Sequence, residues 1–183
     1  MSKMVKTFQE CLSEFGSEYA IRGELAAGRL FRVGHGLYAD VPTPGFLDLA
    51  MKRHPKAVVC LDSAFFYQGL TDVVPDALHL ATARSAVRIR DANVRQHFVP
   101  TKLLDVGRTT LVRNGTELRT YDLERLAIDA VRMRARLPYE LYKEVVLSLR
   151  ARSADLYPAK IADYLEAFPR KDSVLDAIEK EIF

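Results

Sequence analysis

The 183-residue sequence predicts an α+β fold, because its hydrophobic periodicity changes between regions. Apolar residues recur at helical spacing in the first part of the chain and again after residue 122. Between residues 70 and 122 they alternate or run together, which is typical of strands. Asn114-Gly115, between two such runs, is the strongest hairpin signal in the chain. We therefore expect a small, mostly antiparallel sheet packed with helices.

Two short helices are expected at the start of the chain, at residues 3–15 and 17–28. The first has an apolar face and ends at Gly16. In the second, Ser17 is a candidate N-cap, and Gly28 stands where a helix commonly ends in a left-handed conformation.

Two short extended pieces follow the second helix and meet at residues 34–36 (GHG), whose glycines tolerate positive φ. A helix followed by a basic strand, a Gly-rich turn and a second strand is the end of a winged helix-turn-helix. A standard one has another full helix before the recognition helix, so we expect a trimmed version. The Pro- and Gly-containing stretch at 41–45 predicts a boundary between a winged-helix domain (residues 1–41) and a C-terminal α+β domain (42–183).

The C-terminal domain is expected to alternate helices and strands before it ends in helices. Thr43 as N-cap and Pro44 at N1 predict a helix through His54, and Asp62-Ser63 predicts one that ends at Gly69. Asp122 is the expected N-cap of a long helix. Strands are expected at 77–82, 94–99 and 109–112, and the later helices at 122–137, 139–152, 159–168 and 173–183.

Composition sets wide limits. The content of 49% hydrophobic and 28% charged residues is ordinary for a globular protein, and a net charge of +3 is weak evidence for a polyanionic partner. Cys11 and Cys60 lie in no CxxC pattern, which favours a reducing compartment. We find no secretion signal and no apolar run of membrane-spanning length, so we expect a cytoplasmic protein with no membrane partner.

Basic residues in the first forty positions are candidate DNA contacts. One lies on the exposed side of the second helix and two lie on the strand that leads to the turn, where they would meet phosphates. Glutamates in the same segment keep its net charge small, so the alternative is a solvated surface of mixed charge. The candidate DNA-binding residues are Lys6, Tyr19, Arg22, Arg29, Arg32 and His35.

A second basic group lies in the C-terminal domain. Arg125, Arg132 and Arg136 share one face of the expected helix with Asp129, which is too little acid to neutralise them. Such a face would bind an acidic partner protein or nucleic acid, and the alternative is a solvated helix face. Further arginines precede it, at positions 84, 88, 90 and 95.

Catalysis finds little support in the sequence. The four histidines stand alone, and there is no HExxH, GxSxG, GxGxxG or Walker pattern. A metal-dependent nuclease would use Asp76 and Glu117, but the lysine of the nuclease pattern is missing after Glu117. We therefore expect no catalytic residue, no metal site and no cofactor.

With these pieces placed, the chain resembles the antitoxin and transcriptional-regulator members of the AbiEi family, from bacterial type IV toxin-antitoxin (abortive infection) systems. The likeness spans nearly the whole chain, and the shared order of loose motifs carries it. These motifs are residues 19–22 (YAIR), 28–39 (GRLFRVGHGLYA), 61–64 (LDSA), 69–75 (GLTDVVP) and 121–129 (YDLERLAID).

The resemblance implies a winged helix that binds double-stranded promoter DNA and represses its own operon. It also implies a C-terminal domain that counteracts a nucleotidyltransferase-like toxin, through a functional link that need not be a physical complex. By position, Tyr19, Arg22, Arg29, Arg32 and His35 would face DNA. The alternative is a non-catalytic protein-binding module with a vestigial winged helix. The operator sequence and the oligomeric state do not follow from the sequence.

Overall fold

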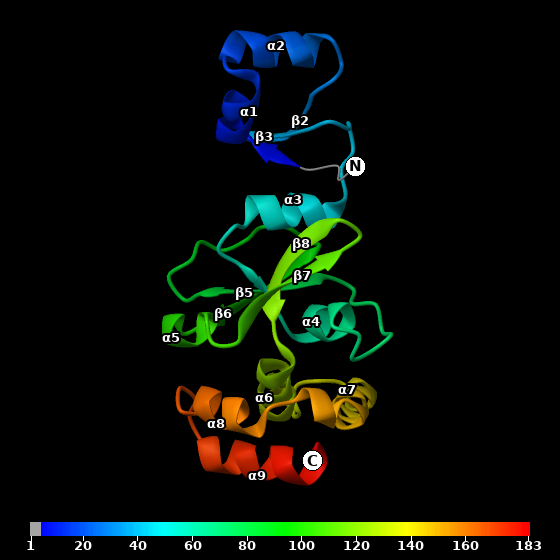
Figure 1. Ribbon diagram of the computed structural model, residues 1–183, viewed down its shortest axis with the longest axis vertical. Helices are drawn as coiled ribbons and strands as arrows, with labels where there is room; N and C mark the ends of the chain where they lie inside the picture. Colours follow the sequence, from blue (N-terminus) through cyan, green and yellow to red (C-terminus); the bar gives the residue numbers. More distant parts are fainter. Residues whose placement is uncertain (1–4) are drawn as a thin grey trace. The chain divides into compact units, whose positions relative to one another are not determined.

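The computed structural model describes residues 5–183 and has an α+β fold (Figure 1). The chain forms two compact units. Among the described residues, the first consists of residues 5–56 together with Leu111–Leu118, and the second of Ala57–Thr110 and Arg119–Phe183. The boundary expected between residues 41 and 42 therefore lies inside the first unit. Within the described residues, no helix has the length and hydropathy needed to cross a membrane.

The first unit is built around a three-stranded antiparallel sheet of order β1-β3-β2. Two helices connect its first strand to its β2–β3 hairpin. Its elements are β1 (Lys6–Thr7), α1 (Phe8–Phe15), α2 (Glu18–Ala26), β2 (Phe31–Gly34), β3 (Leu37–Ala39) and α3 (Phe46–Arg53). The hairpin expected around residues 34–36 and the second helix are thus confirmed.

The helix expected at residues 3–15 is shorter than predicted, because a strand comes first. Lys6 and Thr7 pair with β3, and α1 begins at Phe8. A capping box fixes this start: the Thr7 hydroxyl accepts a hydrogen bond from the Glu10 N–H, and the Glu10 carboxylate accepts one from the Thr7 N–H. The part of the expected helix at residues 3 and 4 lies outside the described residues.

Two small apolar clusters hold the first unit together. One joins α1 and α2 through the buried side chains of Cys11, Ile21 and Leu30. The other lies on the sheet, where Leu49 of α3 packs against a cluster that contains Leu37. The helix α3 begins after Gly45, which is its N-cap, so the expected cap at Thr43 is wrong.

The second unit contains a sheet of order β4-β5-β6 and a group of helices. The hairpin β7–β8 begins and ends in this unit, while its tip belongs to the first. The elements are β4 (Val58–Val59), α4 (Leu61–Tyr67), β5 (Leu78–Ala83), β6 (Val94–Val99), α5 (Thr101–Leu104), β7 (Arg108–Arg113), β8 (Thr116–Tyr121), α6 (Leu123–Met133), α7 (Tyr139–Ala151), the 3-10 helix η1 (Ser153–Asp155), α8 (Pro158–Leu165) and α9 (Lys171–Glu181).

The sheet of the second unit is mixed, which corrects the expectation of a mostly antiparallel sheet. β4 and β5 are antiparallel, but β5 and β6 are parallel from the pair Leu78–Val94 to the pair Ala83–Val99. A tight turn after Ala83 would have made a hairpin. Instead, residues 84–93 lead the chain back to the edge where β5 begins, so that β6 runs in the same direction.

The helix α6 is the centre of the helical group (Figure 1), and it contacts α4, α7, α8 and α9. Leu126, Ala127 and Ile128 are fully buried. Asp122 caps the helix as expected, because its carboxylate accepts a hydrogen bond from the Arg125 N–H at 2.9 Å. The helix ends at Met133, four residues before the expected end, where the chain enters a turn.

Gly107, in the turn before β7, lies against α6 more closely than any side chain would allow. Its φ is +72°, and a Cβ atom there would lie 2.4 Å from the Cβ of Arg125. Gly69 has nearly the same φ, +70°, but a Cβ there would meet no atom within 4 Å. A substitution at Gly69 would therefore introduce backbone strain alone, whereas one at Gly107 would introduce both strain and a steric clash.

We expect Gly107→Ala to lower the free energy of unfolding by about 3 kcal/mol, because left-handed strain and overpacking against α6 add together. The control Gly69→Ala carries the strain alone and should lose only about 1 kcal/mol. Urea unfolding of both variants measures this difference. Equal losses would show that the approach of Gly107 to Arg125 is not a constraint.

Candidate functional site

The first candidate combines two parts of the first unit, the outer face of α2 and the β2–β3 hairpin, which are called together the helix–hairpin surface. Helical spacing places Tyr19, Arg22, Gly23 and Ala26 on the side of α2 that faces away from the buried Ile21. All four are exposed, and the side chain of Tyr19 is 87% exposed.

The hairpin contributes two exposed polar side chains, Arg32 and His35. Arg32 lies on β2 and pairs in register with Tyr38. His35 and Gly36 form the turn, and Gly36 has a φ of +65°. Within residues 5–183, Arg32 makes no ion pair, so its charge is available to a ligand.

Three of the predicted DNA-binding residues are already paired with glutamates. The Lys6 Nζ lies 2.7 Å from a Glu14 oxygen, and its side chain is only 22% exposed. The remaining pairs are Arg22–Glu18 at 3.6 Å and Arg29–Glu24, in which Nε and Nη2 donate two hydrogen bonds at 2.8 and 2.7 Å.

The Arg29–Glu24 pair is the best formed of these. The hydrogen bonds from Arg29 lower the pKa of Glu24 below its ordinary value, and the same bonds raise the pKa of Arg29. Residues 1–41 contain five Lys or Arg and five Asp or Glu residues. The helix–hairpin surface therefore has local positive charge at Arg32 but no excess of basic over acidic residues around it.

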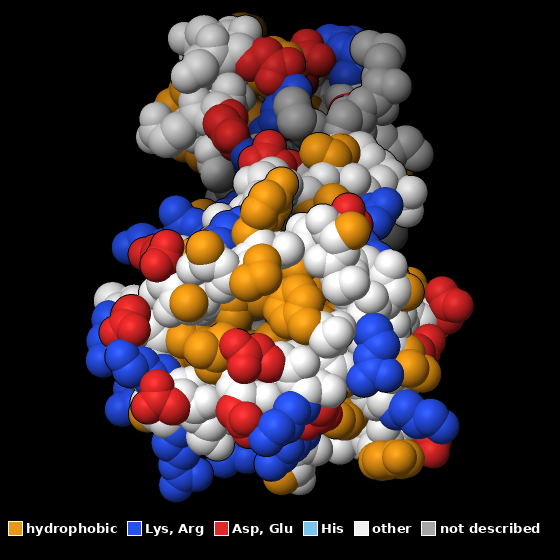
Figure 2. All heavy atoms as spheres, turned by 60° about the horizontal axis from the view of Figure 1, so that its bottom comes forward, with side chains coloured by type: hydrophobic (Ala, Val, Ile, Leu, Met, Phe, Trp, Pro, Cys, Tyr) orange, Lys and Arg blue, Asp and Glu red, His pale blue; other side chains and the backbone are white. Residues whose placement is uncertain are grey.

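Charge of both signs is also interspersed on the face drawn in Figure 2, where it surrounds an area of exposed hydrophobic side chains. Among the described residues, this face therefore has no continuous positively charged area. Any electrostatic recognition of a ligand there would depend on local groups of residues rather than on the net charge of the protein.

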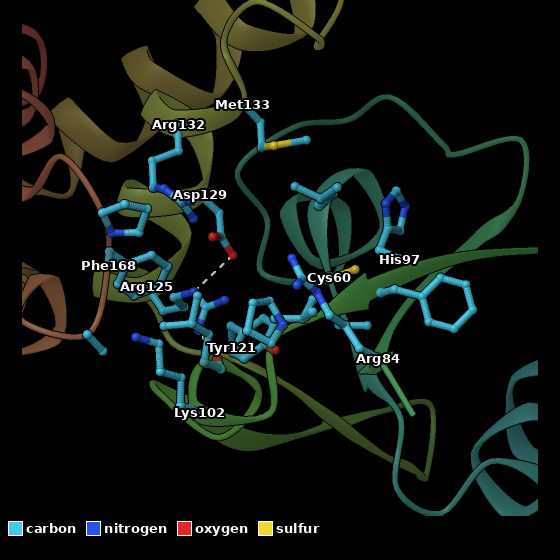
Figure 3. Close-up of a pocket in the computed structure, with 18 of the residues that line it drawn as sticks. Cys60, Arg84, His97, Lys102, Tyr121, Arg125, Asp129, Arg132, Met133 and Phe168 are labelled. Atoms are coloured by element: carbon cyan, nitrogen blue, oxygen red, sulfur yellow. Dashed lines mark hydrogen bonds and ion pairs between the residues drawn. The ribbon is translucent and has the colours of Figure 1, made fainter. Parts of the chain in front are cut away.

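The second candidate is a cavity of about 840 Å³ within the second unit, called here the C-terminal pocket. Figure 3 shows side chains that converge on it from the sheet, from α5 and from α6. The predicted partner-binding residues Arg125, Arg132 and Arg136 all line it. The structure thus brings these three together, but in different environments.

Arg125 is buried, with only 3% exposure, rather than placed on a solvated helix face. Its Nε donates to Asp129 at 3.1 Å, and its Nη1 donates to the carbonyl oxygens of Leu103 and Val106, both at 2.7 Å. Its guanidinium also lies 4.3 Å from the ring centre of Tyr121. These contacts fix the Nε and Nη1 atoms of Arg125 within the second unit, so this arginine supports the pocket.

Asp129 is the acid that neutralises Arg125. Burial raises the pKa of the Asp129 carboxyl above its ordinary value, although the charge of Arg125 and its hydrogen bond oppose this change. Arg132 and Arg136 are both exposed at the edge of the pocket. The Arg132 guanidinium lies 4.6 Å from the centre of the Phe168 ring.

Sequence reasoning missed part of this pocket. Lys102 and Phe168 line it, yet they come from segments more than sixty residues apart, and neither belongs to a recognisable motif. Arg84 stood out only as one of several arginines. No local pattern could have joined them, because the fold of the second unit alone places them side by side.

The pocket offers little for covalent catalysis. The thiol of Cys60 lines it, but burial raises its pKa well above the ordinary value, so the reactive thiolate is disfavoured. Within residues 5–183, no group of three or more His, Cys, Asp or Glu side chains is arranged to hold a metal ion. The basic side chains that line the pocket are suited to binding an anion.

Two histidines that stand alone in the sequence meet in the structure, because β5 and β6 are neighbours. The Nε2 of His97 lies 3.3 Å from the Nδ1 of His79. Burial and the charge of His79 lower the pKa of His97 to about 4, and burial also lowers the pKa of His79. Both imidazoles are therefore neutral at pH 7.

Several residues of the motifs that resemble the AbiEi family have structural roles. Asp122 caps α6, and the buried Glu124 accepts hydrogen bonds from the Tyr157 N–H at 3.3 Å and from Lys160 at 3.1 Å. In the GLTDVVP segment, the Thr71 hydroxyl donates to Glu144 at 2.8 Å. These motifs fix the helical group of the second unit.

No protein family model matches the chain, and no curated protein sequence matches it. Among solved structures, the crystal structure of the Rv2827c protein from Mycobacterium tuberculosis is similar over 95% of this chain and 72% of that chain. The TM-score is 0.56 and the sequence identity is 22%. At this identity, the likeness shows a shared fold.

The histidine pair predicts a pH dependence of stability. In the unfolded chain, an imidazole takes up a proton below about pH 6.5, whereas in the folded protein His97 does so only near pH 4. Between these values the unfolded state binds more protons, so we expect the free energy of unfolding to fall as the pH falls from 6.5 to 4.

The variant His97→Gln should lose part of this decrease, because glutamine does not titrate. Urea unfolding of the parent and the variant at pH 7.5 and pH 4.5 measures the change. An identical decrease in both proteins would contradict the lowered pKa of His97.

Proposed function

We propose that this protein is a DNA-binding transcriptional repressor whose first unit is a trimmed winged helix-turn-helix. The order β1-α1-α2-β2-β3 and the sheet order β1-β3-β2 support this proposal. In this reading, α2 is the recognition helix and the β2–β3 hairpin is the wing that lies on phosphate. The resemblance to AbiEi-family regulators points in the same direction.

The exposed face of α2 is the observation that carries the proposal. Gly23 lies in the interior of this helix, where glycine is about 1 kcal/mol less favourable than alanine. Packing does not require it, because a Cβ at this position would meet no atom within 4 Å. Small residues at Gly23 and Ala26, beside Tyr19 and Arg22, suit a helix that lies close against a DNA groove.

The helix α3 supports the trimmed reading. The first unit lacks a full helix between α1 and α2, which are joined at Gly16 and Ser17. Its third helix instead follows the hairpin in sequence, where Leu49 packs on the sheet cluster and Lys52 pairs with Glu10 of α1 at 2.6 Å. α3 thus gives the small unit a core that two helices and short strands would not supply alone.

The mechanism is stoichiometric. Arg32 would neutralise a phosphate directly, whereas Arg22 and Arg29 would exchange their glutamate partners for phosphates. This exchange is feasible because exposed ion pairs are typically worth less than about 1 kcal/mol. A repressor bound at the promoter would exclude polymerase, and the protein itself would have no catalytic role.

We further propose that the chain is the antitoxin of a type IV toxin-antitoxin system in the cytoplasm. The second unit would counteract a nucleotidyltransferase-like toxin, with or without direct contact. This part of the proposal rests on the resemblance to the AbiEi family. Coexpression with a nucleotidyltransferase-like toxin encoded alongside this chain would test it, because growth should be restored only when this chain is present.

The double variant Arg22→Ala/Arg32→Ala should bind DNA from the region upstream of the gene about tenfold more weakly than the parent, because two charge-assisted phosphate contacts are lost. The slope of log affinity against log salt should also become smaller by about 2. Gel-shift titrations at several salt concentrations, with a footprint on the same DNA, measure both effects.

The control for this experiment is Lys180→Ala, which removes an exposed cation of α9 that pairs with Asp176 at 2.7 Å. It should bind the upstream DNA like the parent. Unchanged affinity in Arg22→Ala/Arg32→Ala would remove the helix–hairpin surface from the proposal.

The variant Gly23→Ala should affect stability and binding in opposite directions. An added methyl group should raise the free energy of unfolding by about 0.5–1 kcal/mol, because alanine is the better helix former. The same methyl group should weaken DNA binding if α2 lies against the groove. A variant that is more stable and binds equally well would contradict the close approach of α2.

A second function is favoured by the balanced charge of residues 1–41. In this alternative, the chain is a non-catalytic protein-binding module with a vestigial winged helix, and the glutamate partners of Lys6, Arg22 and Arg29 keep the surface neutral. The alternative predicts no shift of upstream DNA at low salt. The gel-shift titration of the parent protein therefore separates the two functions.

A further inference from the structure

The C-terminal pocket gathers four basic side chains from the second unit. Arg84, Lys102, Arg132 and Arg136 all line it, and none forms an ion pair within the part of the chain that the structure describes. All four are exposed at the cavity, so they are accessible to a ligand.

The acids that line the same cavity are already engaged. Asp129 accepts a hydrogen bond from the buried Arg125, and Glu166 accepts two from Lys171, at 2.8 and 2.9 Å. Asp129 also interacts electrostatically with Arg132, but within the described residues neither carboxylate forms an ion pair with any of the four cations. The pocket therefore has an excess of positive charge that the helix–hairpin surface lacks.

These cations come from separate segments. Arg84 follows β5, Lys102 lies on α5, Arg132 is near the end of α6 and Arg136 is in the turn after it. Charges of the same sign repel one another, so cationic side chains on a protein surface are usually spread apart. Four cations without an ion pair around one cavity of about 840 Å³ therefore need an explanation. The volume is in the range of sites that hold a molecule of nucleotide size.

Aromatic side chains complete the pocket. The ring of Phe168 packs under the guanidinium groups of Arg125 and Arg132, at 4.8 and 4.6 Å from its centre. These contacts hold Arg132 at the cavity. Phe98, on β6, also lines the pocket and is 46% exposed. An exposed aromatic ring beside a group of arginines provides a stacking surface for a base.

We propose that the C-terminal pocket binds a nucleoside triphosphate or diphosphate. The phosphate chain would lie among Arg84, Lys102, Arg132 and Arg136, since arginine binds phosphate through two parallel hydrogen bonds. The base would lie against Phe98. This site is separate from the proposed DNA contacts, all of which lie in the first unit, and it does not depend on the proposed function.

The charge of the ligand favours a polyphosphate over a singly charged anion. Four cations confined to one cavity are matched best by a compact group that carries three or four negative charges, as a triphosphate does. The buried Arg125–Asp129 pair beneath them is already neutral, so it neither attracts nor repels the ligand strongly. Arg125 contributes through its contacts with Asp129, Leu103 and Phe168, which also line the cavity.

Isothermal titration calorimetry on the full chain tests the proposal, with ATP, GTP, CTP and UTP as probes. Inorganic pyrophosphate, adenosine and citrate serve as comparison ligands for the phosphate chain, the base and a polycarboxylate. We expect at least one triphosphate to bind more tightly than pyrophosphate and citrate, and adenosine to bind weakly or not at all.

The variant Arg132→Gln/Arg136→Gln should weaken triphosphate binding at least tenfold. The matched control is Arg88→Gln/Arg90→Gln, which removes two exposed arginines of the same unit that do not line the cavity. It should change the affinity by less than twofold, although it removes the same net charge. Phe98→Ala should weaken triphosphate binding but leave pyrophosphate binding unchanged.

Three results would overturn the proposal: no probe binds, the pocket variants and the control lose affinity equally, or citrate binds as tightly as every triphosphate. The DNA-binding proposal is tested separately. Arg22→Ala/Arg32→Ala should still bind the triphosphate, and Arg132→Gln/Arg136→Gln should still shift upstream DNA. A failure of one proposal can therefore be distinguished from a failure of the other.

Discussion

The packing of the second unit depends most on the contacts of one buried group, the guanidinium of Arg125. It joins α6 to the carbonyl oxygens of Leu103 and Val106, and it packs against the rings of Tyr121 and Phe168. A buried charge without these partners would be strongly destabilising, because desolvation alone costs several kcal/mol. The elements around Arg125 therefore have to be in place together.

This constraint explains the short helix α5, which no sequence pattern predicted. Four residues make a helix with hardly any internal hydrogen bonds, and its last carbonyl groups have no partners within it. The side chains of Arg125 and Tyr121 satisfy them, since the Tyr121 hydroxyl donates to the Leu104 carbonyl at 3.0 Å. Gly107 then lets the chain pass close to α6 before β7 begins.

The same interaction shapes the C-terminal pocket. Asp129 forms its ion pair with Arg125, and Glu166 forms its ion pair with Lys171. Within the described residues, Arg84, Lys102, Arg132 and Arg136 at the cavity therefore form no ion pair. The first unit shows the opposite arrangement, in which glutamates accompany most of the basic residues. A count of arginines therefore says little about where positive charge is available. The pairing of each arginine in the fold decides it.

The sequence by itself determined the local elements. Ser17 and Asp122 cap the helices that they were expected to cap, and Asn114-Gly115 makes the hairpin turn, because these signals act between residues a few positions apart. A competing local signal, the capping box of Thr7 and Glu10, starts α1 at Phe8, later than the apolar periodicity predicts.

Only the tertiary structure decided the direction of β6, the burial of Arg125 and the meeting of Lys102 with Arg132 at one cavity. Strand direction depends on the path of a connection that carries no regular pattern, and burial depends on which elements pack over a helix face. Helical spacing placed Arg125 and Arg132 on the same side of α6. Whether that side faces water or protein is set by residues distant in the chain, and no local pattern records it.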